Sequence, residues 1–289
     1  MTPAVDTPRK SQLPWAEIAW FGILIVACYG PVLYFLGRQW TTDEDMGHGF
    51  FVPIIACFIV WQRRDELMAL KPRPSWWGLP VVLWGAAQLM LGTLGVELFT
   101  SRVAFIITLI GAVLLLAGKQ MLRKLAFPIF LLFFMVPIPA VIYNQITFPL
   151  QILASQLANN ALDFMNIPVL RDGNILTLTN QTLSVVEACS GIRSLLSLTF
   201  LSLVYGYFFE KKQWIRVVLF LATIPIAIIA NGSRVTITGI LTQWKPELAE
   251  GFFHESTGWV IFMIALAILI LFHQVLARVA HAVNAWRSR

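Results

Sequence analysis

The chain has 289 residues, of which 58% are hydrophobic and 12% are charged. Soluble domains carry roughly 25% charged residues, so this composition excludes an ordinary soluble protein and indicates a chain that folds in lipid. The net charge of +6 at pH 7 does not indicate nucleic-acid binding, because the basic residues form short clusters between apolar runs. That distribution is typical of a membrane protein, in which it sets the orientation.

The apolar runs predict eight helices. Membrane-spanning helices need about 20 apolar residues, and the sequence lacks the alternation of a membrane β-barrel. The first run continues into further spans and has no small-residue cleavage site behind a short core, so we expect a span and not a cleaved signal. The fold class predicted is an all-α polytopic membrane protein. The eight expected helices cover residues 16–36, 49–61, 76–95, 102–117, 125–142, 190–209, 214–231 and 257–277.

Lysine and arginine positions predict the orientation. With the N-terminus in the cytoplasm, fifteen of the 21 basic residues fall on the inner side, as the positive-inside rule favours. Both termini are therefore expected inside. The expected organisation is one transmembrane domain over 16–277, between cytoplasmic tails at 1–15 and 278–289.

The longest segment expected not to span, 143–189, falls on the outer, periplasmic side. Near its end, leucine and valine alternate with polar residues over Asn174–Ala188, and Asn180-Gln181 is a suitable turn. Period-two alternation around a polar turn predicts a small β-hairpin. This hairpin would lead directly into the sixth helix.

Three cysteines differ in their surroundings. Cys28 and Cys57 lie inside apolar runs and are expected to be buried, inert thiols. Cys189 lies in EACSGIRS, where the sixth helix begins. A helix start, capped by Ser190 or by Cys189 itself, directs N–H groups and a positive dipole end at the sulfur. With Arg193 four residues on, this setting favours the reactive thiolate. The structural alternative is a small residue that fills a tight helix start.

Two further reactive residues are expected at the same outer boundary. Arg234 ends the seventh helix in ANGSRVT, and His254 precedes the eighth in GFFHESTGW. An imidazole can take a proton from a thiol and pass it to a leaving amine. A guanidinium suits the oxyanion that forms on a scissile carbonyl. The alternatives are a histidine that anchors the interface and an arginine that snorkels to the headgroups.

Supporting residues are predicted around these three. Asn231 adds a hydrogen-bonding group, and Glu187 either orients the histidine or pairs with Arg193. His48, in DMGHGFFVP, is a candidate for substrate contact or a residue of a simple turn. No Cys/His spacing indicates a metal, so neither a metal nor a cofactor is expected.

With these motifs, the sequence resembles the exosortase family, membrane transpeptidase-like proteins of Gram-negative bacteria. The resemblance rests on EACSGIRS, NGSR, FHESTGW and HGFFVP, and it covers about 16–277. It implies a thiol peptidase or transpeptidase of the inner membrane, with its site on the periplasmic side. Cys189 would be the nucleophile, His254 the general acid/base and Arg234 the transition-state stabiliser, acting through a thioester acyl-enzyme.

The resemblance also implies partners. The substrates would be exported proteins with a C-terminal Pro-Glu-Pro motif, a hydrophobic helix and a basic tail. An amine, a lipid, a glycan or water would accept the acyl group. Three alternatives stay open at this point: a transporter or channel, a non-catalytic assembly factor for exopolysaccharide export, and an enzyme that acts on lipid.

Overall fold

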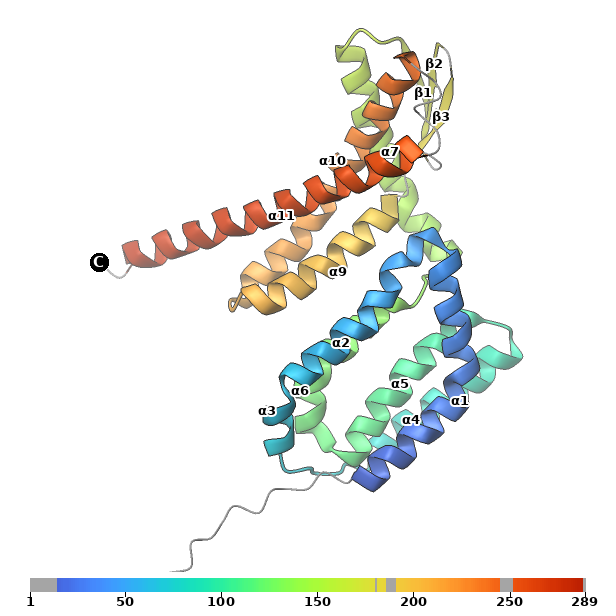
Figure 1. Cartoon of the computed structure of the whole chain (residues 1–289), viewed down its shortest axis with the longest axis vertical. Helices are drawn as coiled ribbons and strands as arrows, with labels where there is room; N and C mark the ends of the chain where they lie inside the picture. Colours follow the sequence, from blue (N-terminus) through green and yellow to red (C-terminus); the bar gives the residue numbers. More distant parts are fainter. Residues whose placement is uncertain (1–14, 180, 186–190, 245–251, 288–289) are drawn as a thin grey trace, which may run out of the picture. The chain divides into compact units, whose positions relative to one another are not determined.

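The computed structural model describes residues 15–179, 181–185, 191–244 and 252–287. These residues are almost entirely helical, with one small antiparallel sheet (Figure 1). The chain divides into two compact units, one ending at Pro139 and the other beginning at Ala140.

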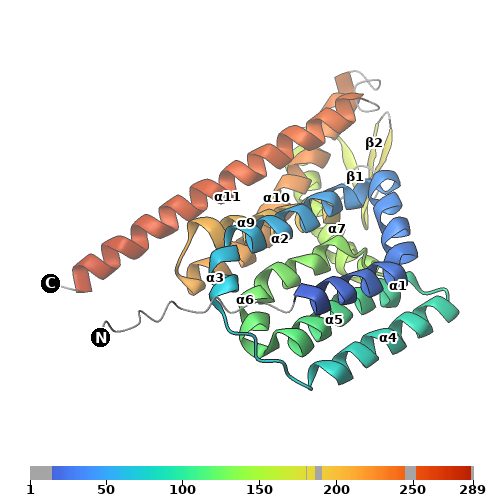
Figure 2. The ribbon, with the colours of Figure 1, turned by 60° about the horizontal axis from the view of Figure 1, so that its bottom comes forward.

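The first unit is a helical bundle centred on α5, which contacts α1, α4 and α6. Figure 2 shows α1, α5 and α4 side by side. The elements of this unit are α1 (Trp15–Thr42), η1 (Glu44–Phe50), α2 (Phe51–Gln62), α3 (Arg64–Ala69), α4 (Gly78–Leu94), α5 (Leu98–Leu116), α6 (Gly118–Leu131) and η2 (Leu132–Met135).

Glycines bring α4 and α5 together. Gly78, Gly85 and Gly92 repeat every seven residues, which places them on one face of α4, and all three are buried. A Cβ atom added to Gly85 would lie 2.2 Å from Oγ1 of Thr108, and one added to Gly92 would lie 2.3 Å from Oγ of Ser101. Small residues of this kind permit close helix packing in lipid, where no hydrophobic force drives helices together.

A buried tyrosine joins α1 to the same helix pair. The hydroxyl of Tyr29 lies 2.6 Å from Oγ1 of Thr108 and 3.2 Å from the carbonyl oxygen of Ala104. Tyr29 is only 2% exposed, so these contacts satisfy a hydroxyl that would otherwise be unpaired in an apolar interior.

The second unit consists of four long helices and the small sheet. Its central helix is α10, which contacts α7, α9 and α11. The elements are α7 (Ala140–Phe164), β1 (Val169–Asp172), β2 (Ile175–Leu178), β3 (Thr182–Ser184), α9 (Gly191–Phe209), α10 (Gln213–Trp244) and α11 (Phe252–Arg287).

The predicted hairpin is confirmed as β2 and β3. The two strands pair antiparallel with Leu176 opposite Leu183, and the Leu178 amide donates to the Gln181 carbonyl across the turn, 2.9 Å away. A further strand, β1, pairs with β2 in the order β1-β2-β3. Gly173, with φ of 60°, makes the tight turn between β1 and β2, a backbone conformation that glycine adopts readily.

The inner face of the sheet packs on α7 and α10. All four residues of the predicted alternation are at most 6% exposed. They share one buried cluster with small residues of α7 and with Val235 of α10. The sheet is also tied to α7 by a hydrogen bond from the Ser155 hydroxyl to the Gly173 carbonyl, 2.9 Å long. The residues of this cluster from the strands and from the position after β3 are Leu176, Leu178, Leu183 and Val185.

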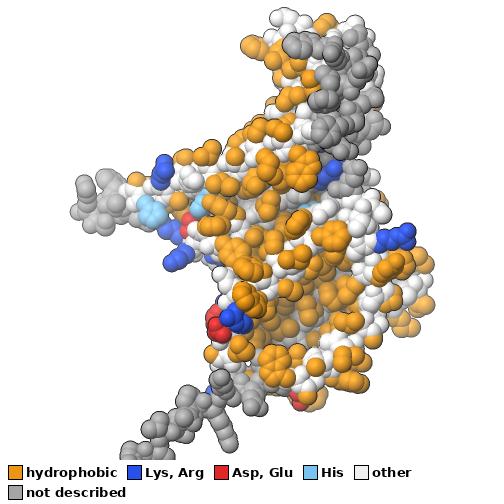
Figure 3. Space-filling model, viewed as in Figure 1, with side chains coloured by type: hydrophobic (Ala, Val, Ile, Leu, Met, Phe, Trp, Pro, Cys, Tyr) orange, Lys and Arg blue, Asp and Glu red, His pale blue; other side chains and the backbone are white. Residues whose placement is uncertain are grey.

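Large apolar side chains cover much of the outer surface (Figure 3). Five described helices are long and apolar enough to cross a membrane, and a sixth span results if Gly118–Met135 and Ala140–Phe164 together form one broken span. Two of the eight expected spans, α4 and α9, are shorter apolar helices. The structure therefore supports a helical membrane protein, with five or six long spans by length and composition.

Four expectations about local structure differ from the fold. The helix expected at 125–142 is broken, since α6 ends at Leu131 and α7 begins at Ala140. The segment 143–189 begins with a long helix, α7, which the sequence analysis did not predict. The helix expected at 214–231 continues to Trp244, and the one expected at 257–277 covers Phe252–Arg287. In α10, Gly232 and Gly239 do not end the helix, because they face Leu157 and Leu162 of α7, where a Cβ atom would come within 3.0–3.1 Å of the leucine side chains.

The expectation that Cys28 and Cys57 are buried is wrong. Both thiols are free and exposed on the surface of the first unit. An apolar run does not by itself indicate a buried side chain in a membrane protein, because the outer surface of a helix is apolar too where it faces lipid.

Candidate active site

The predicted nucleophile lies in a segment whose neighbours on both sides are described by the structure. Cys189, Ser190 and Glu187 are outside the described residues. The last described residue before them is Val185, which is fully buried in the cluster of the sheet. The first after them is Gly191, where α9 begins.

Arg234 lies in the middle part of α10, ten residues before its end, and is half-buried. Asn231 is one turn earlier on the same helix and is 7% exposed. Val235, next to Arg234, is fully buried in the cluster that also holds Val185. The sheet that leads towards Cys189 therefore packs on α10 at the level of Arg234.

The guanidinium of Arg234 lies against the backbone of α11. A Cβ atom added to Gly258 would be 3.1 Å from Cζ and Nη2 of Arg234 and 3.3 Å from Nη1. Gly258 lies in the second turn of α11, which begins at Phe252. The absence of a side chain at this position leaves the space that the planar guanidinium occupies.

His254 is placed by the same helix. It was expected just before the eighth helix, and the structure instead puts it in the first turn of α11. Position 254 is four residues before Gly258, so the two positions share one helix face. The side chain of His254 is outside the described residues.

The remaining predicted residues divide between the two units. Arg193 lies in the first turn of α9 and is half-buried. Since α9 is described only from Gly191, the expected one-turn spacing between Cys189 and Arg193 remains a prediction. His48 belongs to the first unit, where its Nε2 lies 3.1 Å from the carbonyl oxygen of Phe134.

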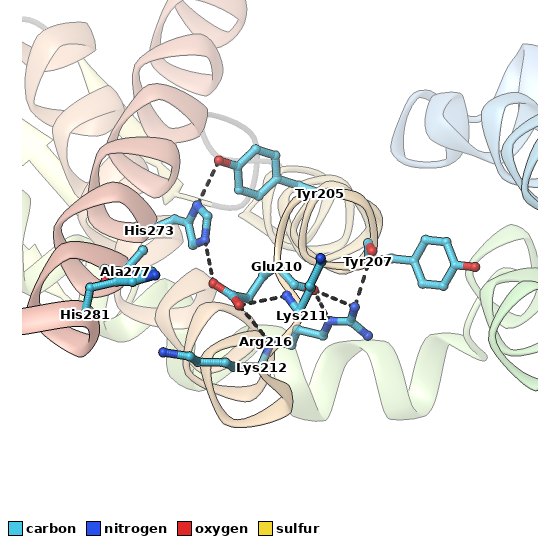
Figure 4. A network of polar contacts seen from close by, with 9 residues as sticks. All are labelled: Tyr205, Tyr207, Glu210, Lys211, Lys212, Arg216, His273, Ala277 and His281. Carbon is cyan, nitrogen blue, oxygen red and sulfur yellow. Dashed lines mark hydrogen bonds and ion pairs between the residues drawn. The ribbon is translucent and has the colours of Figure 1, made fainter. Parts of the chain in front are cut away.

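A second histidine of α11 takes part in a separate polar network, which the sequence analysis did not predict (Figure 4). Nδ1 of His273 lies 2.9 Å from the Tyr205 hydroxyl, and its Nε2 lies 3.2 Å from a carboxylate oxygen of Glu210. The other Glu210 oxygen accepts from the amides of Lys211 and Lys212, each 2.7 Å away. Position 273 is 15 residues beyond Gly258 on α11, or about 22 Å along the helix, so this network is remote from Gly258.

The Glu210 network ties the end of α9 and the start of α10 to the middle part of α11. Arg216 of α10 donates from Nε to the Glu210 carbonyl over 2.8 Å, which satisfies one of the open carbonyls at the end of α9. Burial raises the pKa of the Glu210 carboxyl, but the Lys212 amide, His273 and the Lys211 amide together bring that pKa below its ordinary value. The carboxylate is therefore the form that holds His273 of α11 against the turn between α9 and α10.

We expect Glu210→Gln to lower the melting temperature on the order of 3 °C at pH 7, because a charged hydrogen bond contributes roughly 1–2 kcal/mol. A carboxyl whose pKa is lower in the folded state stabilises above its unfolded pKa, and this contribution is lost as the pH falls below 4.5. Thermal unfolding in detergent at pH 7 and at pH 4 measures the difference between the two proteins. An equal or larger difference at pH 4 would contradict the assigned role of the carboxylate.

The described residues contain no cluster of His, Cys, Asp or Glu that would hold a metal ion. Several spans, a small sheet packed on α7 and α10, and an arginine set against the start of α11 define an integral membrane protein of helical architecture. A family model described as "Transmembrane exosortase (Exosortase_EpsH)" matches residues 40–271. Since the match covers most of the 289 residues, the chain belongs to the transmembrane exosortase family. No curated protein and no solved structure matches significantly.

Proposed function

We propose that this protein is a cysteine peptidase or transpeptidase that acts at the outer boundary of the bacterial inner membrane. Cys189 is the nucleophile, His254 the general acid/base and Arg234 the stabiliser of the oxyanion. The observation that carries the proposal is the approach of the Arg234 guanidinium to Gly258, one helical turn from His254. Membership of the exosortase family supports it.

The position of the nucleophile is supported by the elements on either side of it. Val185 and Val235 share one buried cluster, so the last described residue before Cys189 lies beside the part of α10 that carries Arg234. After Cys189 the chain enters α9 at Gly191, and open N–H groups at a helix start favour a nearby thiolate.

The proposed substrates are exported proteins that end in a Pro-Glu-Pro motif, a hydrophobic helix and a basic tail. The tail helix would lie in the bilayer and bring the motif to the membrane boundary. Confining both partners to one membrane supplies part of the proximity that a bimolecular reaction otherwise lacks.

The proposed reaction has two steps. The Cys189 thiolate attacks the scissile carbonyl, and the C–N bond breaks as the imidazolium of His254 gives its proton to the leaving amine. The exported protein then remains as a thioester on Cys189. An amine or water attacks this thioester, loses a proton to the imidazole and releases the thiolate, giving a new amide or a free carboxylate. Arg234 stabilises the negative oxygen in both steps.

The proposal is tested with the full-length protein in proteoliposomes that also hold a reporter with the three-part C-terminal signal. We expect the reporter to lose its tail, and a reporter whose Pro-Glu-Pro segment is replaced by Gly-Ser residues to stay intact. A transporter or an assembly factor without chemistry would leave both reporters uncut.

The approach of Arg234 to α11 makes Gly258→Ala informative. The added methyl group would press on the guanidinium, so we expect kcat to fall roughly tenfold from the weaker oxyanion interaction. Alanine favours a helix over glycine by about 1 kcal/mol, so the melting temperature should be unchanged or higher. Tail cleavage and thermal unfolding measured on the same preparation separate the two effects.

Gly206→Ala is the matched control for this variant. Gly206 is a helical glycine of α9 that also faces an arginine, but a Cβ atom there would lie 3.5 Å from Cγ of Arg216, an ordinary contact. This variant should keep wild-type kcat. Full activity of Gly258→Ala would show that the contact between Arg234 and α11 is irrelevant to the reaction.

A further inference from the structure

An open pocket in the first unit lies between the end of α1 and the start of α5. Its volume is about 360 Å³. The lining residues of α1 repeat at the spacing of one helix face, and those of α5 are one turn apart. The residues that line it are Phe35, Arg38, Gln39, Thr42, Leu98 and Arg102.

Arg102 is the unusual member of this lining. The residue is 4% exposed, and its Nε is buried with no hydrogen-bond partner among the described residues. A buried guanidinium nitrogen that lacks a hydrogen-bond partner is expensive in a medium of low polarity. The arrangement is therefore incomplete without a group that accepts its hydrogen bonds.

The nearby carboxylates are already occupied. Glu97 interacts electrostatically with Arg102, but its oxygens accept from the amides of Phe99 and Thr100, 3.0 and 2.6 Å away. Asp43 accepts from its neighbours Gln39 and Asp45. In the part of the chain that the structure describes, neither carboxylate forms an ion pair with an arginine of the pocket.

The second guanidinium of the pocket comes from Arg38, which is exposed. Two guanidinium groups at one pocket suit an anion with several oxygens, such as a phosphate, which arginine binds through parallel hydrogen bonds. The Gln39 amide already donates to Asp43, and the Thr42 hydroxyl donates to the Arg38 carbonyl. The two arginines are thus the donors that remain for a ligand.

The pocket walls indicate where such a phosphate comes from. Phe35 and Leu98 are 53% and 52% exposed. Both α1 and α5 are candidate membrane spans, so the pocket lies where two spans end. Arg102 is four residues inside α5, or about 6 Å along the helix axis, the depth of the headgroup region. Apolar walls beside a cationic site match acyl chains attached to a phosphate.

We propose that Arg38 and Arg102 bind the phosphate of an anionic membrane phospholipid, with its acyl chains against Phe35 and Leu98. The bound lipid completes the hydrogen bonding of Arg102 and fixes the ends of α1 and α5. A phosphate diester carries a negative charge that complements the guanidinium groups, and a net anionic lipid is favoured over a zwitterionic one.

The test is native mass spectrometry of the full-length protein released from vesicles of phosphatidylglycerol and phosphatidylcholine. We expect the wild type to retain phosphatidylglycerol, and Arg38→Gln and Arg102→Gln each to retain it roughly tenfold less, since each removes a charge-assisted contact. Arg64→Gln is the control, because Arg64 lies on α3 and faces no part of the pocket. Arg38 is exposed, so its variant should fold normally even if Arg102→Gln does not.

Three outcomes would overturn the proposal. Equal retention of phosphatidylglycerol by the wild type and both pocket variants would show that the two arginines do not bind the lipid. Release of the lipid by millimolar inorganic phosphate would show that the site binds phosphate, but that a lipid is not its ligand. Retention of an acidic peptide in place of phosphatidylglycerol would identify a carboxylate ligand instead.

Discussion

Cys189→Ala should abolish removal of the tail. Replacing the nucleophile of a peptidase typically lowers kcat by about 10⁴–10⁶, so uncut reporter should accumulate in the membrane. Cys189→Ser should be nearly as inactive, because a serine hydroxyl, unlike a cysteine thiol, does not ionise at neutral pH. The measurement is the fraction of reporter cut over time, with the protein quantified in each membrane preparation.

The chain provides its own controls for this prediction. Its only other cysteines are Cys28 and Cys57, both free and exposed on the first unit. Alanine at either position should leave cleavage unchanged. Normal cleavage by Cys189→Ala would show that the reaction does not use this thiol, whatever the family resemblance.

Arg234→Ala should reduce kcat/KM by about 10²–10³, the usual loss when a donor to an oxyanion is removed. Arg234→Lys should recover part of this loss, because an ammonium restores the charge but not the planar pair of donors. Steady-state kinetics on the reporter should show the loss mainly in kcat, since the interaction is strongest when the oxygen is negative.

Arg216→Ala separates chemistry from folding. Arg216 lies near the start of the same helix, α10, and donates to the Glu210 carbonyl. This variant should lower the melting temperature while the kcat of the folded fraction stays normal. If Arg234→Ala behaved in the same way, Arg234 would be a structural residue and not a group that contacts the reacting carbonyl.

The hairpin shows what sequence pattern alone can establish. Leucine at 176 and 178 and the apolar pair at 183 and 185 alternate with polar residues, and all four became the buried face of the sheet. Strand register follows from this alternation, because a slip of one residue would expose every apolar side chain. The membrane class and the family were predictable too, since both depend on composition and on local motifs.

Helix ends and helix faces were less predictable, because they depend on packing. Gly232 looks like a helix end in the sequence, but it is where α10 meets Leu157 of α7. The long helix α7 was missed because it mixes polar and apolar residues and is not by itself apolar enough to span. The buried face of this helix includes Ala154, Ser155, Ala158 and Leu162.

The candidate site rests on residue types that the sequence shows and on contacts that it does not. Cys189, Arg234 and His254 stood out because each is a reactive residue near the end of an expected span. The sequence offered no reason to connect Arg234 with Gly258, because that contact arises only when α10 and α11 pack together.

The most direct test is to trap the acyl-enzyme. Wild-type protein mixed with reporter is quenched in acid within the first turnover, digested and analysed by mass spectrometry. We predict a hydroxylamine-sensitive thioester between Cys189 and the new C-terminus of the reporter, in amounts that approach one per protein when the acceptor amine is withheld. Cleaved reporter without any modification of Cys189, under conditions that preserve thioesters, would contradict the account.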